Sequence, residues 1–274
     1  MIGGAAMLMA AGGAQVIGSG ENPAQPLIDH FGGRLIRAYS TREPGGAFQD
    51  GAGSTPALSG DPVGGLRNWA GNGITAEASG GERPTLGVHD GVLSVVFNGT
   101  TNFLSDSTFS PGASRVAMAT DYLWPDVASQ TFVAVAPENT GGVLWVSFVG
   151  DNGPTNGLRR RLMVRSANAT GATARRQEMF LSPDLAVRKR AIAFFDRSFS
   201  AGDLRYWEDA VENTSPSLLN NNHSGTGNVA TATMMIGANS GASFFAGHFS
   251  RLAVVTGAIS SGDVDVLDPW SAWS

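Results

Sequence analysis

The residues best suited to chemistry form a short aromatic and acidic run, Tyr206-Trp207-Glu208-Asp209, followed by Glu212. Two carboxylates about 5–10 Å apart can hydrolyse a glycosidic bond. Alternation along a strand predicts that Glu208 and Glu212 share one face, with no further acidic residue between them on that face. Three interpretations stay open: a catalytic pair, ligand-binding residues on a loop or rim, and a solvated surface.

Aromatic rings and amides add candidate binding residues elsewhere. Tyr122 and Trp124 lie in the turn-like stretch DYLWPDV (121–127), and Asn221 and Asn222 lie in a polar run with the composition of a loop tip. An exposed ring can stack on the apolar face of a sugar, and amides can hydrogen-bond to sugar hydroxyls. The predicted glycan contacts are Tyr122, Trp124, Tyr206, Trp207, Glu208, Asp209, Asn221 and Asn222. A structural role for each, in the core or on an exposed loop, stays open.

Other reactive chemistries lack their residues. The chain has no cysteine, which excludes disulfides, thiolate metal sites and cysteine nucleophiles. Its four histidines, His30, His89, His223 and His248, have no metal-ligand spacing, so no metal site is predicted. The sequence contains neither a G-x-S-x-G element nor a phosphate-binding G-K-[ST] loop. A pI near 5.3 gives no sign of nucleic-acid binding.

The basic residues are concentrated in one place, around Arg159, Arg160 and Arg161, with Arg165, Arg175 and Arg176 nearby in sequence. Strand alternation puts Arg159 and Arg161 on one face of a sheet and Arg160 on the other. This concentration is suited to an acidic polysaccharide or an acidic partner subunit. A solvated strand edge that blocks aggregation is the alternative.

The elements that must position these residues are mostly strands. Glycine is abundant, 37 of 274 residues, and only 15% of the residues are charged, which argues against coiled coils and helical bundles. Short apolar runs alternate with turn residues, as in antiparallel sandwiches. The predicted strands cover about 34–39, 92–97, 114–120, 131–136, 143–149, 158–165, 178–181, 188–196, 231–238 and 248–257.

The two ends of the chain differ from this strand pattern. Residues 260–273 predict a helix capped by Ser260 or Ser261, with Asp263, Asp265 and Asp268 at its start and on its solvent face, and with Pro269 ending or kinking it. The uncharged first 20 residues contain an apolar stretch too short for a membrane span. We therefore divide the chain into an attachment segment (1–46), a sandwich (47–258) and a C-terminal helix (259–274).

Residues 47–86 resemble the opening of bacteriophage and prophage proteins that carry a concanavalin A-like, laminin-G-like lectin/glucanase sandwich. The matching pieces are Phe48-Gln49-Asp50, Thr55-Pro56, Asp61-Pro62-Val63-Gly64, Gly71-Asn72-Gly73 and Arg83-Pro84-Thr85-Leu86. The stretch GHFSRLAVVTG (247–257) is similar to the closing strand of laminin-G-like domains.

The sequence departs from this resemblance at its acidic positions. An FDG-x-DD element is replaced by Asn98, Thr100, Thr101 and Asn102, and the aspartate before the glycine turn is replaced within 68–70. Calcium prefers carboxylate oxygens, so the substituted motif does not support a calcium site; bound calcium stays open as an alternative, and no other cofactor is expected. The alternating E-x-D-x-E pattern of glucanases on this fold is also absent, so we expect no enzyme activity.

The resemblance implies an all-β fold, an antiparallel two-sheet jelly-roll sandwich with a short C-terminal helix. It also implies a virion location, as a spike, fibre or decoration component that binds host cell-surface polysaccharide. The expected partners are other virion subunits, contacted through residues 1–46, and further copies of the chain, with a trimer favoured; neither nucleic acid nor membrane is expected. The alternatives are a purely structural virion subunit and a polysaccharide depolymerase.

Overall fold

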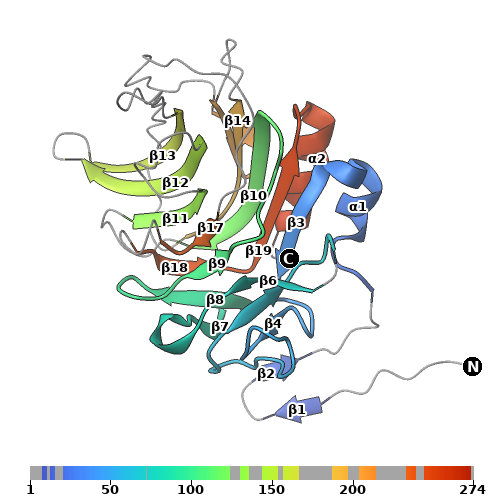
Figure 1. Ribbon diagram of the computed structural model, residues 1–274, viewed down its shortest axis with the longest axis vertical. Helices are drawn as coiled ribbons and strands as arrows, with labels where there is room; N and C mark the ends of the chain where they lie inside the picture. The colour runs from blue at the N-terminus through green and yellow to red at the C-terminus, as the bar shows by residue number, and fades with distance from the viewer. Residues whose placement is uncertain are drawn as a thin grey trace, which may run out of the picture.

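A computed structural model describes residues 8–10, 13–15, 21–71, 73–123, 130–135, 144–153, 157–166, 187–196, 204–213, 233–238 and 244–272. Two antiparallel sheets pack face to face, and two helices lie outside one of them (Figure 1). This architecture confirms the predicted two-sheet sandwich with a C-terminal helix. Near the N-terminus, β1 (Leu8–Ala10) and β2 (Gly13–Gln15) pair with each other in a separate sheet.

The first large sheet has nine strands and branches at β10. Its main order is β16 (Val211–Glu212), β15 (Leu204–Glu208), β14 (Arg188–Asp196), β10 (Arg115–Leu123), β18 (Ala246–Phe249), β8 (Val92–Asn98) and β7 (Thr85–His89), while β19 (Arg251–Thr256) pairs with β10 and with β3 (Leu35–Ser40). Strand β10 therefore lies at the centre of this sheet, bordered by three strands.

The second large sheet has eight strands. Its order is β13 (Gly157–Ser166), β12 (Leu144–Gly153), β11 (Gln130–Val135), β17 (Met234–Ile236), β9 (Leu104–Asp106), β6 (Ile74–Glu77), β5 (Gly65–Arg67) and β4 (Ala47–Phe48). The described side chains that pack between the sheets are mostly aromatic and aliphatic. Phe132 is central to this core, with its ring centroid 5.0 Å from that of Phe245 and 5.6 Å from that of Phe249.

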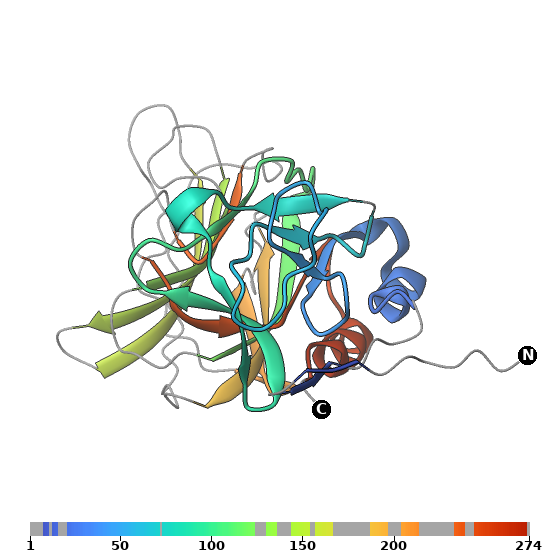
Figure 2. The ribbon, with the colours of Figure 1, turned by 90° about the horizontal axis from the view of Figure 1, so that it is seen from below.

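The outer face of the nine-stranded sheet is covered by α1 (Gln25–Phe31), by a short 3₁₀ turn, η1 (Gly32–Arg34), and by α2 (Ser261–Ser271). Figure 2 shows the two helices side by side against the sheet. A second short 3₁₀ turn, η2 (Gly80–Glu82), precedes β7. In the part of the chain that the structure describes, no helix has the length and apolar character needed to cross a membrane.

Helix α2 is fixed at its start by a capping box. Ser260 accepts a hydrogen bond from the backbone of Asp263, whose carboxylate accepts one from the Ser260 backbone. Burial opposes ionisation of Asp263, but hydrogen bonds from Ser260 and His30 and the charge of Arg34 outweigh it and lower the pKa of the carboxyl. Asp263 thus lies in the first turn of the helix, as predicted, but it is buried and not on the solvent face.

The C-terminal half of α2 corrects two further expectations. Asp268 is buried against Arg190, with 2.8 Å between carboxylate and guanidinium, and burial raises the pKa of this carboxyl. Asp265 is exposed as predicted. The helix continues through Pro269 to Ser271, and Trp270 anchors it by donating from its indole N–H to the carbonyl of Pro23, 2.9 Å away.

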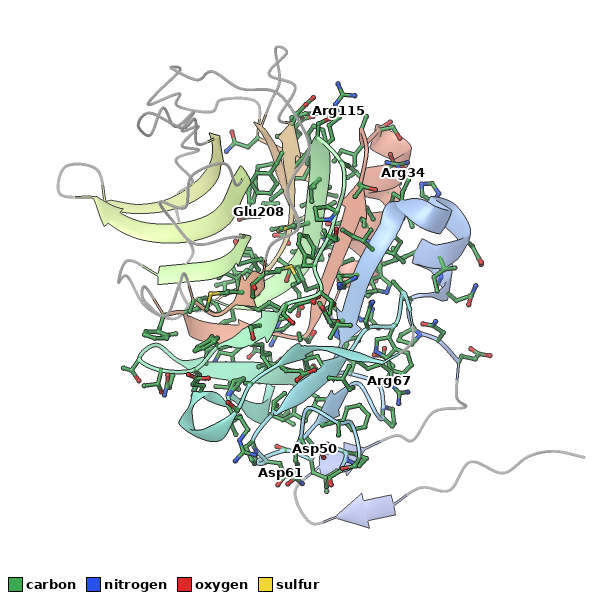
Figure 3. The ribbon with its side chains drawn as sticks, viewed as in Figure 1. Arg34, Asp50, Asp61, Arg67, Arg115 and Glu208 are labelled. Carbon is green, nitrogen blue, oxygen red and sulfur yellow. The ribbon has the colours of Figure 1, made fainter. Side chains whose placement is uncertain are left out.

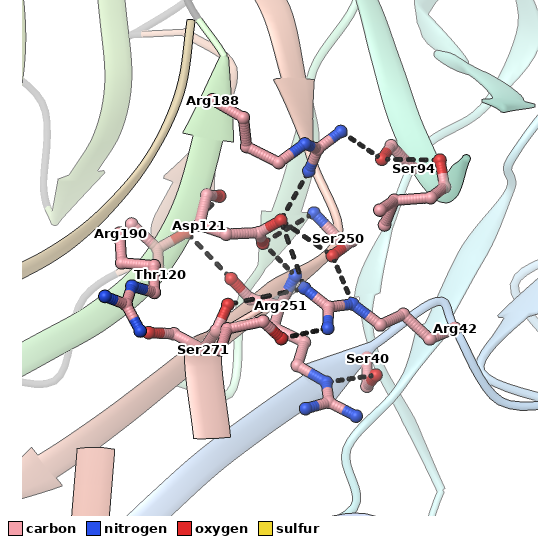
Figure 4. Close-up of polar contacts among 12 residues, drawn as sticks. Ser40, Arg42, Ser94, Thr120, Asp121, Arg188, Arg190, Ser250, Arg251 and Ser271 are labelled. Atoms are coloured by element: carbon pink, nitrogen blue, oxygen red, sulfur yellow. Dashed lines mark hydrogen bonds and ion pairs between the residues drawn. The ribbon is translucent and has the colours of Figure 1, made fainter. Parts of the chain in front are cut away.

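The buried carboxylate of Asp121 ties the end of α2 to the sheet (Figure 4). Its two oxygens accept hydrogen bonds from the side chain of Ser250 (2.8 Å) and from the backbone N–H groups of Ser250 (2.9 Å) and Arg251 (2.7 Å). They also bind the guanidinium groups of Arg188 and Arg42. Arg42 donates in turn to the last carbonyls of α2, where a cation complements the helix dipole.

Most predicted strands are present, with shifts of a few residues. The single strand predicted over 248–257 is wrong: it is divided at Ser250 into β18 and β19, because the backbone N–H groups of residues 250 and 251 bind Asp121. Helix α1 was not predicted. Together with β3, which pairs with β19, it places residues 25–40 in the outer layer and in the nine-stranded sheet. The strand predicted over 178–181 lies outside the described residues.

We expect Asp121→Asn to lower the free energy of unfolding by about 3–5 kcal/mol, because it leaves the buried Arg188 guanidinium without its counter-charge. Urea unfolding followed by tryptophan fluorescence measures the change. Asp265→Asn, the same substitution on the exposed face of α2, should change it by less than about 0.5 kcal/mol. Equal stability of the two variants would contradict a central role for Asp121.

Candidate functional site

Three of the predicted binding residues meet on the inner face of the nine-stranded sheet, near the end of β15. The Tyr206 hydroxyl lies 3.0 Å, and the Tyr122 hydroxyl 3.4 Å, from one carboxylate oxygen of Glu208. The two hydroxyls are themselves 3.2 Å apart. Both tyrosines are fully buried, whereas the Glu208 side chain keeps 21% of its surface exposed (labelled in Figure 3).

Strand pairing explains why these side chains converge. Lys189 lies opposite Tyr122 on the neighbouring strand, and two alanines, Ala191 and Ala193, lie opposite Glu208 and Tyr206. Cross-strand partners point to the same face of a sheet. The small alanine side chains therefore leave room for two phenol rings and a carboxylate in one corner of the core.

Lys189 completes the group on its charged side. Its ammonium lies 3.4 Å from a carboxylate oxygen of Glu208 and 3.4 Å from one of Asp209. The Lys189 side chain is 15% exposed and that of Asp209 is 35% exposed. We call Tyr122, Lys189, Tyr206, Glu208 and Asp209 the Glu208 site. It holds a partly exposed carboxylate in a fixed orientation, which suits it to accept hydrogen bonds from a ligand's hydroxyl groups.

The turn after Glu208 decides which side chains belong to this site. Asp209 and Ala210 both have positive φ, 49° and 67°, as in the type I′ turns of two-residue hairpins. Glu208 pairs with Val211 across the turn, and Trp207 pairs with Glu212. The expectation that Glu208 and Glu212 share a face is therefore wrong: the turn reverses the chain and puts Glu212 on the face of Trp207.

Trp207 lies on the outer face of the sheet, away from Glu208. It is 5% exposed and packs in the apolar layer beneath the helices. The guanidinium of Arg205 lies 4.4 Å from the centre of its ring, and Arg205 binds both oxygens of Glu212 at 2.8 and 2.9 Å. These hydrogen bonds lower the pKa of Glu212. Trp207, Arg205 and Glu212 thus form a stable outer-face group separate from the Glu208 site.

The remaining predicted contacts, Trp124, Asn221 and Asn222, lie outside the described residues. Sequence reasoning missed Lys189. The sequence does single this residue out, because Lys189 is the chain's only lysine among 18 basic residues. Its pairing with Tyr122, however, could not be read from the sequence.

The motif in 47–86 that carries the resemblance builds structure at the far end of the sandwich. Asp50 accepts hydrogen bonds from Ser54 and Thr55, which lower the pKa of its carboxyl to about 2. Asp61 accepts one from the Gln49 side chain at 3.0 Å. Both carboxylates hold turns in place, so these two positions of the motif have a structural role.

The loop 98–102, where the resemblance would place calcium ligands, is closed by amides. The Asn98 side-chain oxygen accepts hydrogen bonds from the backbone N–H groups of residues 100, 101 and 102. The Asn102 amide donates to the carbonyls of Gly81 and Arg83. Oxygens that could ligate a cation are thereby bound to N–H groups, so these residues do not fit calcium. Nowhere among the described residues do three or more histidine, aspartate or glutamate side chains form a metal-binding group.

Two of the histidines scattered in the sequence meet in the structure. The rings of His89 and His248 are 4.2 Å apart, edge to face, and Arg188 is near both. Burial, the charge of His89 and the charge of Arg188 together lower the pKa of His248 from 6.5 to about 4, against a small opposing effect of Asp90. The Nδ1 atom of His248 is buried without a hydrogen-bond partner. His248 is therefore held neutral in the folded protein.

Comparison with known proteins gives a fold and no family. The sequence matches no protein-family model and no curated protein. Similar solved structures include domain 4 of AbnA, a GH43 extracellular arabinanase from Geobacillus stearothermophilus, in complex with arabinotriose; the chain is 15% identical to it over 85% of its own length and 98% of that domain, with a TM-score of 0.52.

Another similar structure is an arabinofuranosidase complexed with arabinofuranosyl-α-1,2-xylobiose, 14% identical over 91% of this chain and 65% of that one, with a TM-score of 0.54. A GH54 α-L-arabinofuranosidase soaked with 4-nitrophenyl α-L-arabinofuranoside has the same identity and coverage, with a TM-score of 0.55. At these identities the likeness shows a shared β-sandwich fold, one that occurs in carbohydrate-binding and glycoside-active domains.

The turn predicts one stabilising substitution. Ala210→Gly should raise the free energy of unfolding by about 0.5–1 kcal/mol, because glycine adopts positive φ without the steric cost that alanine bears. Thermal and urea unfolding measure the change. Ala258→Gly, at an exposed position without positive φ, should not raise the free energy of unfolding. A loss of stability in Ala210→Gly would show that the turn differs from the one described.

His248 predicts a pH dependence. Since its folded pKa of about 4 lies below the ordinary 6.5, the unfolded chain binds a proton first as pH falls, and stability is lost from pH 6.5 toward 4. We expect a loss on the order of 1 kcal/mol, allowing for solvent screening. His248→Gln should flatten urea-unfolding stability over that range, and Val88→Thr on β7 should keep the parent's slope. An unchanged slope in His248→Gln would contradict the assignment.

Proposed function

We propose that this protein binds a cell-surface glycan through the Glu208 site, without cleaving it. The observation that supports the proposal is a partly exposed carboxylate whose position is fixed by two buried tyrosine hydroxyls and by Lys189. A preorganised carboxylate makes strong, directional hydrogen bonds to hydroxyl groups, and it spares the ligand the entropy of ordering the site.

A binding function without catalysis is supported by the placement of the acids. Glycosidic cleavage usually needs one carboxyl group as acid and another as base or nucleophile on either side of the bond. Glu212 lies on the opposite face, engaged with Arg205. Asp209, the other carboxylate near Glu208 among the described residues, shares the same lysine and accepts a hydrogen bond from the backbone N–H of Arg190.

The setting that we propose for this binding follows the resemblance of residues 47–86. It is a phage or phage-like particle, in which the chain is a spike, fibre or decoration component held by its N-terminal segment and assembled as a homo-oligomer, with a trimer favoured. Weak binding at one site would then be strengthened by many copies on one particle.

The test compares two isosteric substitutions four residues apart. Glu208→Gln removes the charge of the site, and we expect it to weaken binding to bacterial capsule or lipopolysaccharide polysaccharides about 10-fold or more, the value of one charge-assisted hydrogen bond. Glu212→Gln, on the other face, should bind like the parent. Biolayer interferometry on an extract panel measures both, after circular dichroism has confirmed folding.

Three results would change the proposal. Equal binding by Glu208→Gln and the parent would remove Glu208 from the site. Shortened oligosaccharides in the reaction mixture would establish a depolymerase. An absence of binding by the folded, correctly assembled protein would favour a purely structural subunit.

A further inference from the structure

The β12–β13 hairpin has a charge opposite to that of the whole chain. Across residues 144–166 it carries four arginines, Arg159, Arg160, Arg161 and Arg165, and a single acid, Asp151. The chain as a whole has a net charge of −5. A local excess of positive charge on an acidic protein favours an anionic ligand at that place.

The sheet order brings this hairpin opposite the Glu208 site. The ring of Phe132 on β11 lies 6.3 Å from that of Tyr122 on β10, so these two strands face each other across the core. Gly237, at the end of β17, is so close to Phe97 of β8 that a Cβ there would lie 2.4 Å from the ring. Both pairs fix the relative direction of the two sheets.

The strand orders of the two sheets run in the same direction from these contacts. The strands that follow β10 in one sheet therefore face the strands that follow β11 in the other. These are β14 and β15 in one sheet and β12 and β13 in the other. Figure 1 agrees, with β12 and β13 opposite β14 at one end of the sandwich. Strand β13 is the last described strand of its sheet, and β15, which carries Glu208, is next to the last strand of the other sheet, so the two strands lie toward the same end of the sandwich.

Both faces of β13 carry arginine. Alternation puts Arg159, Arg161 and Arg165 at positions of one face and Arg160 at a position of the other. Whichever face is turned toward β15, at least one arginine position belongs to it. The guanidinium group is the side chain best suited to bind carboxylate, phosphate or sulfate with two hydrogen bonds at once.

We propose that the ligand of the Glu208 site is an acidic polysaccharide, with its anionic groups bound by β13 arginines and its hydroxyl groups by Glu208. This inference rests on the proposed glycan-binding function and narrows its ligand class. A neutral glycan would bind Glu208 equally well but offers no anionic group to the arginines, so in this proposal the arginines determine specificity.

The experiment uses uronate-containing capsular polysaccharides, each beside its own carboxyl-reduced product, which keeps the linkages and loses the charge. We expect the parent protein to bind the acidic form at least about 10-fold more tightly at 50 mM NaCl, with the difference shrinking at 500 mM NaCl as salt screens the charges. Arg160→Gln and the double variant Arg159→Gln/Arg161→Gln separate the two faces of β13. One of them should lose most of this preference.

Arg115→Gln is the matched control, since it removes one positive charge at the other end of β10, where Arg115 pairs with Asp196. It should keep the parent's preference. Equal binding of both polysaccharide forms, with Glu208→Gln still defective, would overturn the acidic ligand and leave the proposed function intact. Arginine variants that lower the melting temperature but keep the preference would also overturn it. Binding to no polysaccharide of either kind would overturn both proposals.

Discussion

The arrangement of the nine-stranded sheet depends on the ion pairs and hydrogen bonds of the buried Asp121 carboxylate. It lies on the central strand and binds two backbone N–H groups at the junction of β18 and β19, which fixes where one strand stops and the next begins. Through Arg42 it also holds the end of the C-terminal helix. A buried charge is costly unless it is fully paired, so each of these contacts constrains the others.

Asp121 also influences the candidate site, because successive side chains of β10 point to opposite faces of the sheet. Asp121 and Tyr122 are neighbours on β10 and point to opposite faces, the first into the ionic cluster and the second toward Glu208. Fixing the register of β10 against β14 by the Asp121–Arg188 pair therefore also fixes Tyr122 opposite Lys189. The ionic cluster is structural, yet it sets the geometry of the residues that we assign to ligand binding.

The fold was largely accessible from the sequence, because the signals involved are local. Apolar runs bounded by Asn, Asp and Gly turns located most of the long strands, and Ser260 with Asp263 located the start of α2. The site was less accessible, because it depends on pairing between distant segments. Glu212 lies on the face opposite to Glu208 because a two-residue turn with positive φ at Asp209 and Ala210 separates them. The residue types Asp and Ala do not predict this turn. Helix α1, of seven residues, is stabilised mainly by packing against α2, which a local pattern does not contain.

The most direct test of the account uses the chain's only lysine. Lys189 joins the two carboxylates of the Glu208 site, so amine acetylation followed by mass spectrometry reports on that site, with the N-terminal amine as an internal reference. A saturating polysaccharide that occupies the site should slow acetylation of Lys189 severalfold and leave the reference amine unchanged. If Lys189 reacts equally fast with and without a polysaccharide that demonstrably binds, the glycan binds elsewhere and the central claim is wrong.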